Sequence, residues 1–236
     1  MSKTLPDVTL RKTAIIAGIG YLVIFITGIY ANFFVVESLI VPGDPSATAL
    51  NISGRELSFR FGILAFIIMV IFDVILAWAL YILFKPVNKS LSLLSAWLRL
   101  VNAVIFAIAL NKLFSILHLL NTAEYVNVYE PGSLHAMVMM DLNSFNNIWL
   151  IGLVFFGVHL SVLGYLILRS EFVPKIIGIL LIIASAGYLA DSFANFLLPS
   201  YPAYKDIFSA IVILPGVIGE LAFTFWLLIK GRKLSG

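Results

Sequence analysis

The chain has 236 residues, of which 61% are hydrophobic and only 11% are charged. A soluble domain is about half apolar and about a quarter charged, and a globule of this size cannot hide so much apolar surface from water. The composition therefore excludes an ordinary soluble fold and predicts a protein whose outer solvent is lipid.

The net charge and the cysteine content exclude further classes. The formal net charge is +3 and the basic residues are scattered along the chain, so we expect membrane-flanking charges and no nucleic-acid partner. The chain has no cysteine, which excludes disulfides, thiolate zinc sites, iron–sulfur clusters and thiol catalysis.

The first apolar run extends from Ala14 to Val36 and follows Lys3, Arg11 and Lys12. It is longer than the hydrophobic part of a secretory signal, and no small-residue cleavage pattern follows it. We therefore expect the first membrane span over residues 14–36.

Five further stretches reach the roughly 20 apolar residues that a helix needs to cross a bilayer. Together with the first they predict an all-α, polytopic transmembrane helix bundle in one domain, residues 1–236, with the further spans at 58–84, 91–120, 143–168, 175–197 and 206–229. Clusters of Pro, Gly and Asn mark the breaks. Residues 134–142 are apolar but too short to cross, so they form either an interfacial helix or an outward extension of the fourth span.

The distribution of Lys and Arg predicts the orientation, because cytoplasmic loops are enriched in both. On the other side of the membrane we expect only Arg55, Arg60 and Lys205. A cytoplasmic N-terminus places ten basic residues inside: Lys3, Arg11, Lys12, Lys85, Lys89, Arg169, Lys175, Lys230, Arg232 and Lys233. We therefore expect both termini in the cytoplasm.

An inner layer of ionisable groups is predicted inside the membrane, where such groups are costly and normally find partners. Counting 1.5 Å per residue places Asp73, Arg99, His159 and Glu220 about 12–17 Å from the cytoplasmic ends of their spans. Asn102 shares a helix face with Arg99. We expect these five residues to form a ligand or proton site.

An outer polar layer is predicted in the opposite half of the membrane. Tyr188, Asp191 and Asn195 share one helix face, and Lys112 lies at a similar depth on another span. Other ionisable residues of the outer half are Glu37, Arg60, His118 and Asp141. We expect a polar region open to the non-cytoplasmic side.

A structural explanation stays open for both layers. Asp73 with Arg99, and Asp191 with Lys112, would then be ion pairs between helices that fix helix register and do nothing more.

His159 has two interpretations. It is either a neutral imidazole, hydrogen-bonded to Glu220 or to a backbone carbonyl, or a proton acceptor. With Asp73 and Glu220 it would offer three ligands to a catalytic zinc ion, but the nearby Arg99 opposes a cation and no H-E-x-x-H motif is present. Haem is disfavoured because His118 and His159 lie at different depths. We expect no metal and no cofactor.

A series of local patterns extends over almost the whole chain. These are Ala14 to Asn32, Leu80-Tyr81 through Lys85-Pro86-Val87-Asn88, Leu98-Arg99-Leu100-Val101, Gly152 to His159, Gly187-Tyr188 through Asp191-Ser192-Phe193, and the region of Glu220. In this order they resemble a bacterial integral membrane family known as domain of unknown function 4386. The resemblance implies a six- or seven-helix protein of a bacterial cytoplasmic membrane, and it supplies no substrate, reaction or cofactor.

The leading functional prediction is a protein that binds or moves a small solute, ion or proton through a polar cavity within the membrane. Arg99 would bind an anionic group or hold Asp73, and His159 and Glu220 would exchange protons. An alternative is an intramembrane enzyme that acts on a lipid-like substrate with the same residues as general acids and bases. A third is a sensory or assembly partner without chemistry. The expected partners are membrane lipid and one small ligand, and no particular oligomeric state is predicted.

Overall fold

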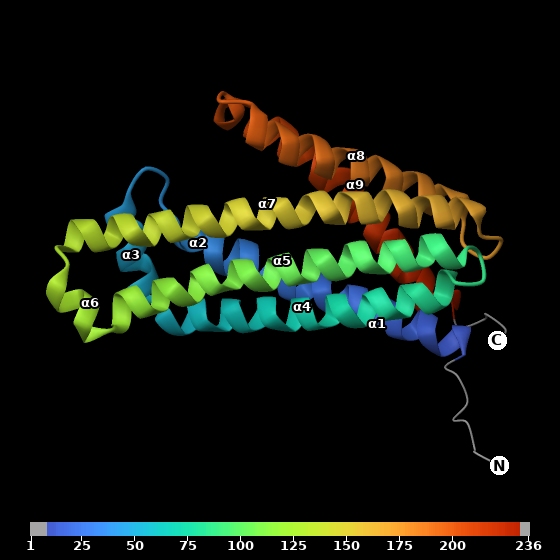
Figure 1. Cartoon of the computed structure of the whole chain (residues 1–236), viewed down its shortest axis with the longest axis horizontal. Helices are drawn as coiled ribbons and strands as arrows, with labels where there is room; N and C mark the ends of the chain where they lie inside the picture. Colours follow the sequence, from blue (N-terminus) through green and yellow to red (C-terminus); the bar gives the residue numbers. More distant parts are fainter. Residues whose placement is uncertain (1–8, 232–236) are drawn as a thin grey trace, which may run out of the picture. The chain divides into compact units, whose positions relative to one another are not determined.

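The computed structural model describes residues 9–231 of the chain (Figure 1). Lys3, Arg232 and Lys233, which contribute to the predicted orientation, lie outside the described residues. The chain divides into two compact units. Unit 1 comprises Met1–Leu22, Asp73–Asn102 and Leu153–Gly236, and unit 2 comprises Val23–Phe72 and Ala103–Gly152.

The described residues form helices joined by short loops. In chain order the elements are α1 (Leu10–Ile29), the π-helical segment η1 (Tyr30–Val36), α2 (Glu37–Leu39), α3 (Pro45–Gly54), α4 (Glu56–Phe84), α5 (Lys89–Asn121), α6 (Ala123–Val128), α7 (Pro131–Arg169), α8 (Lys175–Leu197) and α9 (Tyr201–Ile229). Six helices are long and apolar enough to cross a membrane, if α1, η1 and α2 are counted as one helix over Leu10–Leu39. The predicted all-helical fold with six candidate spans is confirmed.

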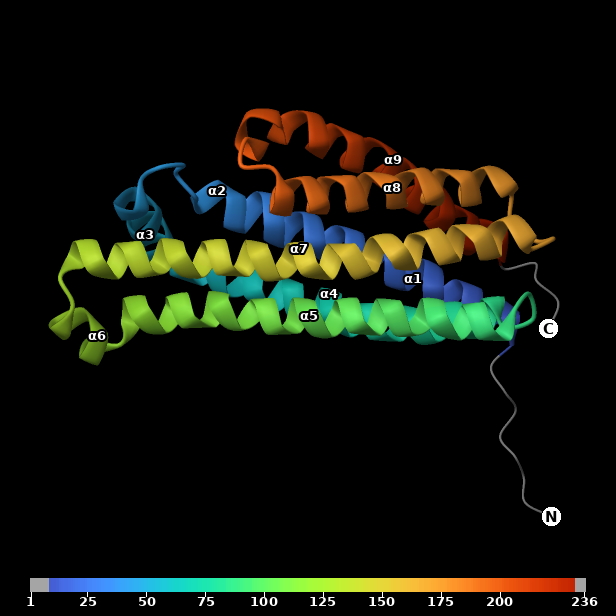
Figure 2. The same cartoon turned by 45° about the horizontal axis from the view of Figure 1, so that its top comes forward.

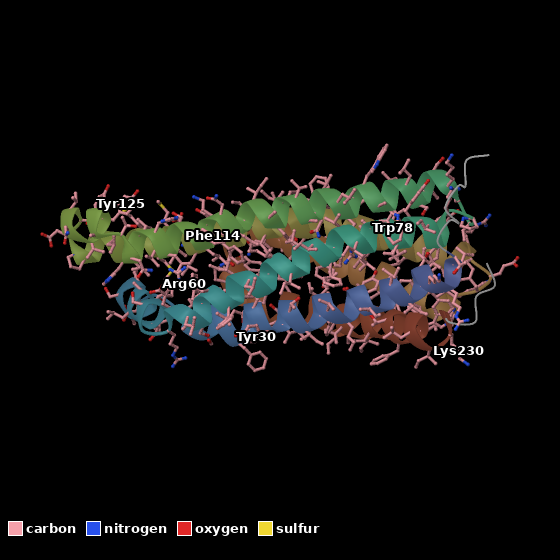
Figure 3. The ribbon with its side chains drawn as sticks, turned by 90° about the horizontal axis from the view of Figure 1, so that it is seen from below. Tyr30, Arg60, Trp78, Phe114, Tyr125 and Lys230 are labelled. Atoms are coloured by element: carbon pink, nitrogen blue, oxygen red, sulfur yellow. The ribbon has the colours of Figure 1, made fainter. Side chains whose placement is uncertain are left out.

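Much of the apolar surface of these long helices is not covered by protein. In the most apolar stretch of each helix, only 33% to 50% of the residues are buried. Among the exposed aromatic side chains labelled in Figure 3 are Tyr30, Trp78 and Phe114, whose relative exposures are 40%, 42% and 41%. Water would strongly disfavour so much exposed apolar surface, whereas lipid accommodates it. The chain is an integral membrane protein.

The outer end of α7 decides between the two alternatives for residues 134–142. These residues belong to α7, which runs without interruption over Pro131–Arg169. Proline is well suited to the first turn of a helix, where its missing N–H would have no partner. At about 58 Å, α7 is much longer than the roughly 30 Å hydrocarbon core. The structure therefore has the outward extension and no separate interfacial helix at these residues.

Two further helices differ from the sequence prediction. The short helix α3 lies in a segment that the sequence analysis treats only as a break between spans. Its start is marked by Asp44, whose side chain accepts a hydrogen bond from the Ala47 N–H at 2.8 Å, followed by proline in the first turn. α9 begins at Tyr201, earlier than residue 206, again with a proline in the first turn.

Glycines bring helix backbones close together in unit 1. A Cβ atom added to Gly164 of α7 would lie 2.7 Å from the carbonyl oxygen of Gly178 on α8. A Cβ atom on Gly187 of α8 would lie 2.7 Å from the carbonyl oxygen of Ile211 on α9. Figures 1 and 2 show α8 and α9 running side by side. Such contacts between small residues are typical of helices that pack in a membrane.

An aromatic core holds unit 2 together. Phe106 of α5 stacks on Trp149 of α7 with ring centroids 3.7 Å apart. Phe66 of α4 and Phe145 of α7 pack against the same indole at 5.1 Å and 5.3 Å. Three long helices of the unit thus share one cluster of rings, which lacks charged groups.

Candidate functional site

Unit 1 contains the ionisable residues of the predicted inner layer. Asp73 lies on α4, Arg99 on α5, His159 on α7 and Glu220 on α9, and each is at most 8% exposed. Each lies about 14–17 Å along its helix from the end that carries the basic residues. The structure therefore brings side chains from four helices to one depth, and the contacts described below join them.

Arg99 is the centre of the group. Its Nη2 donates to Oδ1 of Asp73 at 2.6 Å, and its Nη1 donates to Nε2 of His159 at 3.2 Å. The guanidinium carbon lies 5.2 Å from the ring centre of Tyr21 and 5.4 Å from that of Phe156. These distances are within the range of cation–π contacts. Four side chains thus hold a guanidinium group that is shielded from solvent.

The hydrogen bonds of His159 assign its tautomer. A guanidinium group only donates, so Nε2 of His159 accepts from Arg99 and carries no proton. Nδ1 then carries the proton and donates to the carbonyl oxygen of Ser95 at 2.8 Å, with the Ser95 hydroxyl at 3.0 Å. His159 is therefore a neutral imidazole with both ring nitrogens occupied. Its backbone partner is Ser95, and Glu220 does not take that place.

Glu220 belongs to the same group but has no ion-pair partner. Phe223, three residues later on the same helix face, packs against Tyr21 with ring centroids 5.7 Å apart. Gly216, one turn earlier on α9, leaves room for the Tyr188 hydroxyl, since a Cβ atom there would lie 3.2 Å from it. Among the residues that the structure describes, no cationic side chain forms a salt bridge with Glu220.

Four buried polar atoms of the group have no hydrogen-bond partner within residues 9–231: Oη of Tyr21, Nε of Arg99, and both Nδ2 and Oδ1 of Asn102. Asn102 is 1% exposed and lies one turn from Arg99 on the same helix face. Most buried polar atoms in proteins are hydrogen-bonded, and an orphaned one costs about 1–3 kcal/mol. We call the whole group the Arg99 cluster, with members Tyr21, Asp73, Ser95, Arg99, Asn102, His159, Tyr188 and Glu220.

Tyr188, which was predicted in the outer polar layer, lies next to the other members of the cluster. Its Cα atom is about 20 Å along α8 from Lys175, the same distance as Asn102 lies along α5 from Lys89. Its hydroxyl lies beside Gly216, one turn before Glu220 on α9. The two predicted layers therefore adjoin each other at Tyr188.

The remaining residues of the predicted outer layer have partners within their own units. In unit 1 the Tyr201 hydroxyl donates to Oδ1 of Asp191 at 2.6 Å beside Asn195, which ties the start of α9 to the end of α8. In unit 2, Nζ of Lys112 donates to Oδ1 of Asp141 at 3.1 Å. Asp191 and Lys112 were considered as a pair, but each has a different partner.

Other polar residues of the outer half form local contacts in unit 2. Nε of Arg60 donates to Oε1 of Glu56 at 2.6 Å within α4. Nδ2 of Asn32 donates to Oε1 of Glu37 at 3.0 Å, a spacing of five residues that the π-helical segment brings into line. Exposed pairs of this kind contribute little to stability.

The three residues considered as zinc ligands are not arranged for that role. The guanidinium group of Arg99 contacts both Asp73 and His159, so a cation already occupies the place where a metal would have to lie. Within the described part of the chain, no group of three or more His, Asp or Glu side chains could hold a metal ion.

Two aromatic contributors were missed by the sequence analysis. Tyr21 lies on α1 at about 16 Å from Leu10, the same depth as the ionisable residues, and Phe156 lies one turn from His159 on α7. Extending the depth count to tyrosines would have found Tyr21. Phe156 has no signal of its own among the many aromatic residues of the spans.

Comparisons with known proteins place the chain in a family. Residues 16–231 match the model described as Domain of unknown function (DUF4386). The chain belongs to this family. A relative, an "Uncharacterized protein" of Archaeoglobus fulgidus, is 35% identical over 175 residues, which cover 74% of this chain and 86% of the relative. No solved structure matches. The resemblance to DUF4386 that the local patterns indicate is confirmed, and the Arg99 cluster lies inside the matched residues of this DUF4386 protein.

Proposed function

We propose that this membrane protein binds a small solute, ion or proton at the Arg99 cluster and moves it within or across the membrane. The observation that carries the proposal is the set of buried polar atoms without partners on Tyr21, Arg99 and Asn102. In a lipid-embedded protein such atoms are costly. A bound polar species, with or without water, would supply the missing hydrogen bonds.

The contacts divide the cluster into a fixed part and an open part. Asp73, the two terminal nitrogens of Arg99, and His159 satisfy one another and form a support. Asn102 and Glu220 keep unused hydrogen-bonding and charge capacity. In this division Arg99 holds Asp73, Glu220 and Asn102 contact the ligand, and His159 positions Arg99 without exchanging a proton.

Ser192 supports movement in addition to binding. It lies one turn after Tyr188 on α8, is fully buried, and its hydroxyl has no hydrogen-bond partner among the described residues. A serine inside a helix commonly bonds a carbonyl three or four residues back, and this one does not. Tyr188 and Ser192 offer successive polar positions on one helix face.

We also propose that the protein lies in a bacterial cytoplasmic membrane, as the family resemblance implies, and that both termini are cytoplasmic, on the strength of its basic residues. Because the chain has no cysteine, an introduced cysteine is the only thiol that a labelling reagent can modify, and its accessibility reports the orientation. A Gly132→Cys variant should react with an impermeant maleimide added to intact cells. A Val87→Cys variant should react only after permeabilisation. The opposite labelling would overturn the orientation.

Two measurements on purified protein test the proposed function. Native mass spectrometry with small-molecule and metal analysis should find a stoichiometric non-lipid species, or proteoliposomes should show a flux of protons or ions. We expect either signal to be lost in Glu220→Gln and Asn102→Leu variants, and kept in Asp141→Asn, which changes a carboxylate of unit 2. Absence of both signals in folded wild-type protein would overturn the proposal.

A further inference from the structure

We propose that the species bound at the Arg99 cluster is a single monovalent cation, held by the carboxyl group of Glu220. This inference rests on the proposed function and names the chemical class of its ligand. It follows from the charges of the cluster, from the groups that face Glu220, and from the donors that Arg99 has left.

The charges of the cluster do not balance without a bound cation. Arg99 is the one permanently charged cation of the cluster, and it is paired with Asp73 at 2.6 Å. His159 adds no charge, because its Nε2 accepts from Arg99 and its Nδ1 donates to the Ser95 carbonyl. Glu220 is therefore a second carboxyl group with no cation of its own within residues 9–231.

The groups around Glu220 favour a positive ligand. Phe223, three residues after Glu220 on α9, packs against Tyr21 of α1 with ring centroids 5.7 Å apart, and Gly216, one turn before Glu220, lies beside the hydroxyl of Tyr188 on α8. Both neighbours are uncharged phenols. Arg99 on α5, the cation of the cluster, is paired with Asp73 on α4. A carboxylate left without compensation inside a membrane is strongly disfavoured. Glu220 therefore carries either a proton or another small cation.

An anionic ligand fits Arg99 poorly. Carboxylate and phosphate groups are recognised by arginine through two parallel N–H groups. In Arg99 each terminal nitrogen already donates one N–H, Nη1 to His159 and Nη2 to Asp73, so a pair of bonds to an anion would have to share at least one of these nitrogens. An anion would also add to an existing excess of carboxyl groups. The guanidinium group is a support here and not an anion clamp.

The unpartnered oxygen atoms agree with a small, hard cation. The Tyr21 hydroxyl and the Asn102 carbonyl both have unused lone pairs, and oxygen ligands suit such ions. One surplus carboxyl group matches one positive charge, whereas a divalent ion would need more. The cation is a proton, an alkali-metal ion or an ammonium ion. The following experiment distinguishes these three.

The experiment compares ions on the intact protein in detergent. Thermal unfolding is followed at constant ionic strength while sodium, potassium or ammonium replaces the bulky N-methylglucamine ion. In a second series chloride, acetate and phosphate are exchanged under one cation. Infrared difference spectra after an acid step report protonation of a carboxyl group. The variants are Glu220→Gln and, as the matched control, Glu37→Gln, the same change at an exposed glutamate of unit 2.

We expect one small cation to raise the unfolding temperature in a saturable manner in wild type and Glu37→Gln, and to lose this effect in Glu220→Gln. If the cation is a proton, no other ion changes the unfolding temperature, and a carboxyl band appears in wild type and Glu37→Gln but not in Glu220→Gln.

Specific binding of an anion or a neutral solute at the cluster would overturn this inference and leave the proposed function intact. Absence of any ion effect, any bound solute and any Glu220 band would overturn both. The comparison of cations with anions uses wild-type protein, so it decides even where a variant does not fold.

Discussion

Each unit contains an ion pair between two different long helices, and the two pairs are built differently. In unit 1 the side chains of Arg99 and Asp73 are 1% and 4% exposed, and the guanidinium group also holds His159. In unit 2 the side chain of Lys112 is 38% exposed and bonds Asp141 alone. A planar guanidinium group can serve several partners at once, whereas a lysine on its flexible stem can reach out to a polar surrounding. The first pair therefore gathers further side chains around it, and the second links two helices.

The largest contrast is expected when the carboxylate of each pair is neutralised. Asp73→Asn leaves a buried guanidinium group without its ion-pair partner and should lower the free energy of unfolding by about 3–5 kcal/mol. The matched change Asp141→Asn should cost less than about 1 kcal/mol, because Lys112 remains more than one-third exposed. Chemical unfolding in detergent measures both losses. Equal losses in the two variants would contradict the distinction drawn between the pairs.

Backbone contacts offer a second way to compare the units. Gly187→Ala would place a Cβ atom 2.7 Å from a backbone oxygen of α9 and should cost about 1–3 kcal/mol, because neither helix can move without opening the packing of unit 1. Gly54 in unit 2 has nothing within 4 Å of an added Cβ atom, so Gly54→Ala should change stability by no more than about 0.5 kcal/mol. Thermal unfolding of the two variants is the measurement. A tolerated alanine at Gly187 would show that α8 and α9 do not pack as described.

A gain in stability is expected at Asn102, where the structure has two buried amide atoms without partners. Asn102→Leu keeps the size of the side chain and removes both atoms, so the ligand-free protein should gain about 1–2 kcal/mol while ligand binding is lost. Unfolding without added ligand, and binding measured on the same preparation, test the two effects. A loss of stability would indicate that the amide has partners and is part of the fixed support.

The smallest effect is expected at Ser95. Its hydroxyl lies 3.0 Å from Nδ1 of His159, but the backbone carbonyl of the same residue accepts from that nitrogen at 2.8 Å. Ser95→Ala should therefore cost less than about 1 kcal/mol and leave the Nδ1–H tautomer unchanged. Nitrogen NMR of labelled histidine distinguishes the tautomers. An Nε2–H tautomer or a doubly protonated ring in the wild type would contradict the hydrogen bonds assigned to Arg99.

The helices and the depth of the inner layer could be predicted from the sequence. Spans are long apolar runs, and a fixed rise per residue converts position into depth. For this reason Asp73, Arg99, His159 and Glu220 could be grouped before any contact was known. The segment at 134–142 was harder, because nothing in its composition separates an interfacial helix from a longer span.

The pairing of Asp73 with Arg99 could be considered from the sequence and is observed, but the other partners could not be predicted, because depth does not specify which helices are neighbours. Lys112 bonds Asp141 and Asp191 bonds Tyr201, and neither choice follows from the order of residues. The tautomer of His159 could not be predicted either, because it depends on a backbone carbonyl of another helix.

The most direct test of the central claim is whether the Arg99 cluster can be reached from water. The chain has no cysteine, so Asn102→Cys introduces a single thiol at the cluster, and Val101→Cys introduces one on the neighbouring residue, which is 40% exposed on the apolar outer surface. In reconstituted protein, a small cationic methanethiosulfonate reagent should react at position 102 and should not react at position 101. Equal lack of reaction at both positions would contradict the account and would leave the cluster as a packing element.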